Sequence, residues 1–132
     1  MSAFFLSPII QRVLESLPRD TAEVLETCLD NSASIEADPQ GSVLAHQEHL
    51  RAAARSNEFL DLTQVEDLTK RSLALLGQLG PDTLNAHRKL ILAAVYYFIL
   101  DEDAESDSES ILGLEDDELV IAAIERVVND NA

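Results

Sequence analysis

The chain has 132 residues, of which 46% are hydrophobic and 26% are charged. This length and composition fit one compact domain and exclude an intrinsically disordered chain, a fibrous repeat and a two-domain enzyme. The 25 acidic and 9 basic residues give a net charge of −16, which excludes direct binding to nucleic acid or to an anionic membrane and favours a basic protein partner.

The compartment is indicated by the cysteine content and by the lack of export signals. The single cysteine, Cys28, rules out an internal disulfide framework, and its apolar neighbours place it on the apolar face of a helix. Residues 1–8 contain no base and too few apolar residues for a signal peptide. The longest apolar stretch, residues 90–100, has 11 residues, whereas a membrane helix needs about 20. We therefore expect a cytoplasmic protein without membrane insertion.

Two short helices are predicted at the start of the chain. Pro8 occupies the first position of a helix that Pro18 ends. A second helix begins at Asp20, which has the spacing of a capping box, and stops near Asp30. The polar residues 31–41, with one proline and one glycine, form a connection rather than a domain linker.

Two longer helices follow in the middle of the chain. Ser42 is predicted to cap a helix that turns its apolar residues inward and leaves His46 on its outer side. Thr63 opens a capping box for the next helix, which ends at the Gly-Pro pair 80–81.

The fifth predicted helix, residues 82–100, is the centre of the fold. Asp82 caps it, and from Leu90 onward it is apolar on every side, as expected for a helix surrounded by others. A last helix begins near Glu115 and buries an apolar face that includes Leu119. Because no strand-length alternating run is present, the sequence predicts an all-α fold, a single compact bundle of about six helices over residues 1–132.

An acidic loop, residues 101–118, departs most strongly from an ordinary helical domain. It holds ten acidic residues and no base. A hard divalent cation such as Mg²⁺ or Ca²⁺ would relieve the repulsion between these carboxylates. An EF-hand is excluded, since Ser106 and Leu112 stand where the turn glycine and the closing glutamate belong. The alternative is a solvated acidic loop that binds ions only loosely.

Residues 87–128 combine an apolar helix with regularly spaced carboxylates. The helix contains a tyrosine and is followed by two aspartates four residues apart, a glycine and an Asp-Asp pair. These residues are Tyr97, Asp103, Asp107, Gly113, Asp116 and Asp117. In these types and spacings the segment resembles the YkvA-like domain-of-unknown-function family, although acidic residues replace the proline-rich apolar loop of that family. Because charge replaces that apolar surface, we expect a soluble relative of the family. The resemblance carries no catalytic activity over to this chain.

The resemblance also singles out four of the ten carboxylates, Asp103, Asp107, Asp116 and Asp117, as candidate metal ligands. Gly113 is expected to let the chain bend, so that a hairpin brings the two pairs together. Converging carboxylates would hold Mg²⁺ or Ca²⁺. Alternatively, Asp116 or Asp117 would lie in the first turn of the last helix and accept hydrogen bonds from its backbone N–H groups.

Other chemistry has weaker support in the sequence. His46 and His49 are three residues apart and would hold Zn²⁺ with a third ligand, the alternative being ordinary surface histidines. Cys28 has no neighbouring histidine, and neither a Gly-x-Ser-x-Gly elbow nor a glycine-rich phosphate loop is present. A carboxylate pair acting as general acid and base stays open, because such pairs are recognised by geometry.

Three functions follow from these observations. The favoured one is a non-catalytic acidic helical interaction or regulatory domain that meets a basic partner through the acidic loop. A divalent-cation-binding protein, including a cation-dependent hydrolase, would use the four aspartates. An acidic DNA-mimic inhibitor would suit the net charge, but residues 101–132 carry −11 and residues 1–100 only −5, so the acids are concentrated at one end. The apolar residues Phe4 to Leu6 would dock on the chain's own core or on a second subunit, which leaves a homo-oligomer open.

Overall fold

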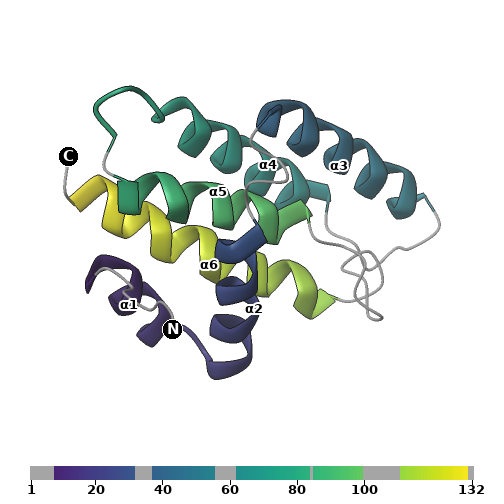
Figure 1. Ribbon diagram of the computed structural model, residues 1–132. Helices are drawn as coiled ribbons and strands as arrows, with labels where there is room; N and C mark the ends of the chain where they lie inside the picture. The colour runs from purple at the N-terminus through teal and green to yellow at the C-terminus, as the bar shows by residue number, and fades with distance from the viewer. Residues whose placement is uncertain (1–7, 32–36, 56–61, 84, 100–110, 131–132) are drawn as a thin grey trace.

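Six α-helices make up the part of the chain that the structure, a computed structural model, describes: residues 8–31, 37–55, 62–83, 85–99 and 111–130 (Figure 1). No strand occurs in these ranges, so the predicted all-α bundle is confirmed. The helices are α1 (Pro8–Glu15), α2 (Arg19–Asn31), α3 (Pro39–Ala54), α4 (Leu62–Gly77), α5 (Asn85–Ile99) and α6 (Ile111–Asp130).

Helix α5 lies at the centre of the bundle and contacts each of the other five helices. The α3–α4 hairpin covers one side of the α5–α6 pair, and α1 and α2 cover the other side (Figure 1). Residues 90–95 of α5 are all buried, as are Tyr97 and Phe98, which confirms the predicted central helix. Within the described ranges, no helix has both the length and the apolar character needed to cross a membrane.

Helix α3 begins earlier than predicted, because Asp38 and not Ser42 is its N-cap. The Asp38 Oδ1 atom accepts a hydrogen bond from the Gly41 backbone N–H at 3.0 Å, and Pro39 occupies the first turn. A Cβ atom on Gly41 would overlap the Asp38 carboxylate where it now lies, so a larger residue there would make the capping side chain shift. Ser42 instead donates from its hydroxyl to the Asp38 carbonyl oxygen at 3.1 Å.

Two further caps are also placed differently from the prediction. Helix α4 already includes Leu62, so Thr63 lies inside the helix rather than at its cap. Asp82 lies in a turn in which the Gly80 backbone N–H donates to Thr83 Oγ1 at 2.8 Å and the Thr83 N–H donates to the Gly80 carbonyl at 3.1 Å. The turn satisfies these backbone groups before α5 begins at Asn85.

Helix α6 begins at Ile111, which corrects the predicted start near Glu115. Gly113 therefore lies within the helix and is not the site of the predicted bend. A helix can include it, because a single glycine lowers helix stability by only about 1 kcal/mol. The first turn of α6 contains no acidic residue, so neither Asp116 nor Asp117 lies there. The predicted burial of Leu119 is also wrong: its side chain is 44% exposed, while the neighbouring Val120 is fully buried.

Candidate functional site

The structure places two of the four predicted metal ligands on α6. Asp117 is buried, with 1% of its surface exposed, and Asp116 is half-buried. Asp103 and Asp107 lie outside the described residues. In the part of the chain that is described, no three His, Cys, Asp or Glu residues are close enough to hold a metal ion. The four-aspartate site for Mg²⁺ or Ca²⁺ stays a prediction.

The two histidines of α3 belong to an aromatic cluster. The ring of His46 meets the edge of Phe98 on α5 with the centroids 4.9 Å apart, and it stacks on His49 at 6.1 Å. His46 is only 7% exposed, so its predicted position on the outer side of the helix is wrong. Its ring therefore serves in packing against the central helix. No third ligand for a zinc ion accompanies this pair among the residues described.

Arg71 on α4 is the centre of an ion-pair network. Its guanidinium binds Glu125 through two nitrogens, Nη2 to Oε1 at 2.7 Å and Nε to Oε2 at 3.0 Å. Its Nη1 atom donates to Glu118 Oε2 at 2.7 Å and to Asp67 Oδ2 at 3.1 Å. The hydrogen bond to Glu125, with smaller contributions from the other two carboxylates, raises the pKa of Arg71 above its ordinary value and outweighs the opposing effect of burial.

Arg51 on α3 forms a second and more exposed network. Its Nη2 and Nε atoms donate to Glu66 Oε2 on α4 at 2.8 and 3.1 Å, and Nη1 donates to Glu48 Oε2 at 2.6 Å. The hydrogen bond to Glu66, followed by that to Glu48, raises the pKa of Arg51. Arg51 and Arg71 are thus both occupied by carboxylates of the fold.

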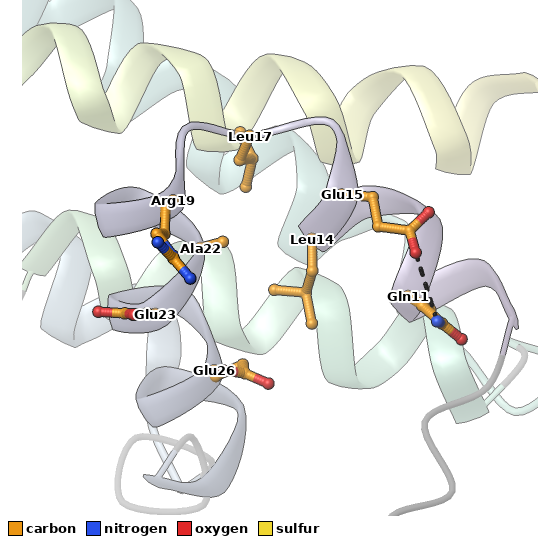
Figure 2. Close-up of a pocket in the computed structure, with 8 residues that line it drawn as sticks. All are labelled: Gln11, Leu14, Glu15, Leu17, Arg19, Ala22, Glu23 and Glu26. Carbon is orange, nitrogen blue, oxygen red and sulfur yellow. Dashed lines mark hydrogen bonds between the residues drawn. The ribbon is translucent and has the colours of Figure 1, made fainter.

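A groove of about 590 Å³ lies between α1 and α2. Leu14 of α1, Leu17 of the connecting turn and Ala22 of α2 form its apolar floor, and Figure 2 shows all three pointing into the space between the helices. The polar lining consists of Gln11, Glu15, Arg19, Glu23 and Glu26.

The turn at Pro18 separates α1 from α2, the two helices that form the walls of the groove. Proline has no N–H to continue the first helix, and the Ser16 backbone N–H still reaches the carbonyl oxygen of Arg12 at 3.1 Å. The Ser16 hydroxyl donates to the Val13 carbonyl at 2.8 Å, which satisfies one of the last carbonyls of α1. The Ala22 N–H then donates to the Pro18 carbonyl at 2.8 Å and starts α2.

Both walls are anchored in the core. Val13 of α1 and Leu25 and Cys28 of α2 are at most 1% exposed, which also confirms the apolar setting predicted for the cysteine. By contrast, Leu14 and Leu17 are only half-buried, since they pack on the rim of the core and not within it. Apolar surface is therefore left open to solvent in the groove.

The groove has an acidic rim. On α2, Asp20, Glu23, Glu26 and Asp30 are spaced by three or four residues and are all exposed, so they share one outer face. With Arg19 as the one base, this helix carries a charge of −3. Among the described residues, no base lies within ion-pair distance of Glu23 or Glu26.

A second hollow, of about 350 Å³, lies between α3 and α4. Its carboxylates, Glu66 and Asp67, are paired with Arg51 and Arg71, and Lys70 also lines it. It therefore presents less uncompensated negative charge than the groove between α1 and α2.

The chain matches no protein-family model, no curated protein and no solved structure. The resemblance to the YkvA-like family rests on the residues of segment 87–128 quoted above and stays a prediction.

Sequence reasoning did not find the groove, because it assigned the function to residues 101–118. Two signals for it are nonetheless present: the regular spacing of the acids of α2, and the leucines Leu14 and Leu17 just before Pro18. What the pattern could not supply was the angle between the two helices, which brings the acids and the leucines to one space.

Proposed function

We propose that this protein is a non-catalytic helical interaction or regulatory domain that binds a basic protein partner. One observation carries the proposal: the four exposed carboxylates of α2 form no ion pair among the described residues and face a single base on that helix, Arg19. Arg51 and Arg71, by contrast, are occupied within the fold. A partner rich in lysine and arginine would supply the missing positive charge.

The lining of the groove favours binding over catalysis. It contains carboxylates, one guanidinium, one amide and aliphatic side chains, but no histidine, cysteine or serine to act as base or nucleophile. Its carboxylates are exposed to solvent, whereas carboxyl groups that act in general acid catalysis are commonly desolvated.

The net charge of −16 has a direct consequence for the association rate. It attracts a basic partner over distances of about one Debye length, roughly 10 Å at 0.1 M salt. Association should be fast at low salt, and affinity should fall as ionic strength rises.

The test is a calorimetric titration of the full chain with a synthetic amphipathic peptide of lysine and leucine, and with the same peptide carrying glutamate in place of lysine. We expect the lysine peptide to bind, with a Kd that rises about tenfold or more between about 50 and about 300 mM salt. The glutamate peptide should not bind. Equal affinity for the two peptides, or no binding of the lysine peptide at low salt, would overturn the proposal.

A further inference from the structure

We infer that the groove between α1 and α2 is the docking site for a basic amphipathic helix of a partner protein. This inference rests on the proposed function and names the surface and the kind of partner. Three observations support it. The apolar floor and the acidic rim are drawn in Figure 2, and the buried residues Val13 and Leu25 attach the two walls to the core.

The floor suits an apolar anchor. Leu14, Leu17 and Ala22 come from α1, the turn and α2 and converge on one space. The volume of about 590 Å³ is that of a typical small-molecule pocket, roughly 300 to 1,000 Å³, and leaves room for apolar side chains of a docking helix. A docking helix presents apolar side chains at positions i, i+3, i+4 and i+7, so a single stripe of such residues can fill a groove between two helices.

The rim selects the charge of the occupant. Glu23 and Glu26 line the groove from α2, and Glu15 lines it from α1, where it accepts a hydrogen bond from Gln11 Nε2 at 3.3 Å. A helix lying between these walls would therefore meet carboxylates on both of its flanks. Arg19 is the one base in the lining, so the balance of the rim is negative. Lysine or arginine beside the apolar stripe matches it, and an acidic helix is repelled.

The walls need no ordering before binding. Val13 and Leu25 fix α1 and α2 to the core and are at most 1% exposed. Preformed walls reduce the conformational entropy that docking would otherwise cost. The hollow between α3 and α4 lacks this combination, because Arg51 and Arg71 already neutralise its carboxylates.

The first experiment locates the bound peptide. The full chain, labelled with ¹⁵N, is titrated with the lysine-leucine amphipathic peptide and with a scrambled peptide of the same composition, which keeps the charge but loses the apolar stripe. We expect amide shifts centred on residues 11–26 and an affinity for the scrambled peptide about tenfold weaker. Shifts centred on another part of the chain, or equal affinity for both peptides, would overturn the inference.

A pair of variants tests the rim. Glu23→Gln with Glu26→Gln removes two carboxylates from the groove, and Asp82→Asn with Glu48→Gln removes two exposed carboxylates elsewhere. Both doubles change the net charge equally. We expect the groove double to weaken binding about tenfold and the control double less than about twofold. Equal weakening by both doubles would show non-specific attraction and contradict the inference.

The outcomes separate this inference from the proposed function. If neither peptide binds, both fail. If the amphipathic peptide binds with shifts away from residues 11–26, the domain still recognises a basic partner but the groove is not its site. If the shifts in residues 11–26 appear when the protein alone is concentrated, a second copy of the chain occupies the groove, and the inference is overturned.

Discussion

Arg71 of α4 and Glu125 of α6 are joined by two hydrogen bonds, Nη2 to Oε1 at 2.7 Å and Nε to Oε2 at 3.0 Å. The two side chains are 22% and 27% exposed. Paired guanidinium and carboxylate groups with this geometry are stronger than single-bonded ion pairs. Arg71 also donates to Glu118, which lies seven residues, or about two turns, before Glu125. One cation on α4 therefore binds two carboxylates on the same face of α6.

Replacing Arg71 with methionine tests this connection. The change keeps an apolar stem but leaves Glu118 and Glu125 close together without their counter-charge. We expect the free energy of unfolding to fall by about 2 kcal/mol, between the values typical of exposed and of buried ion pairs. Arg51→Met is the matched control and should lower the free energy of unfolding by less than Arg71→Met does, because its pairs are more exposed. Urea unfolding measures both, and equal losses would contradict the argument.

Ser72 provides a prediction of increased stability. Its side chain is fully buried on α4, and its Oγ atom has no hydrogen-bond partner among the described residues. Ser72→Ala removes this unsatisfied group and favours the helix, so the free energy of unfolding should rise by about 1 kcal/mol.

The control lies one turn earlier on the same helix. Thr69 is also buried, but its Oγ1 atom donates to the Val65 carbonyl at 2.8 Å. Thr69→Val keeps the shape and removes that bond, so it should lower the free energy of unfolding by about 0.5 to 1 kcal/mol. Thermal melts of the two variants should shift in opposite directions. A loss of stability in Ser72→Ala would mean that its hydroxyl is satisfied.

The two candidate caps of α3 can be compared directly. Asp38→Ala removes the acceptor for the Gly41 N–H and should cost about 1 kcal/mol. Ser42→Ala removes only a hydroxyl that donates to the Asp38 carbonyl, and it should cost less than about 0.5 kcal/mol. Chemical unfolding monitored by circular dichroism gives both values. The reverse order would restore Ser42 as the cap.

The four-aspartate hypothesis predicts a response to divalent cations. Millimolar Mg²⁺ or Ca²⁺ should raise the Tm above its value in chelator at constant ionic strength, because a ligand that binds the folded state stabilises it. The double variant Asp103→Ala with Asp116→Ala should lose that rise, and Asp82→Ala should keep it. Identical melts of the parent protein with and without the cations would end the hypothesis.

The helices and the central position of α5 follow from local pattern. Apolar residues that recur every three or four positions predict a helix wherever they occur, since burial of one face depends on that spacing. A helix that is apolar all round has to be surrounded, and the fully buried Leu90 and Ile91 agree with this. The sequence also contains a signal for the start of α3, because Asp38 followed by Pro39 is a typical helix N-terminus.

Other features depend on residues far apart in the chain. His46 is buried because Phe98 of α5 lies against it. Leu119 is exposed because the face of α6 that packs on the core contains Val120 and not Leu119. Glu125, which Arg71 binds through two nitrogens, is 54 residues away in the chain. Residue spacing within one helix cannot predict these contacts between helices, since they depend on the angles at which the helices pack.

The groove belongs to the same class of feature. In the sequence, Leu14 and Leu17 precede Pro18, and the acids of α2 recur every three or four residues after it. Whether these leucines and acids meet depends on the bend at Pro18 and on how Val13 and Leu25 are drawn into the common core. The sequence therefore determines which side chains each helix carries. Only the packing of the helices determines which of those side chains lie together on a binding surface.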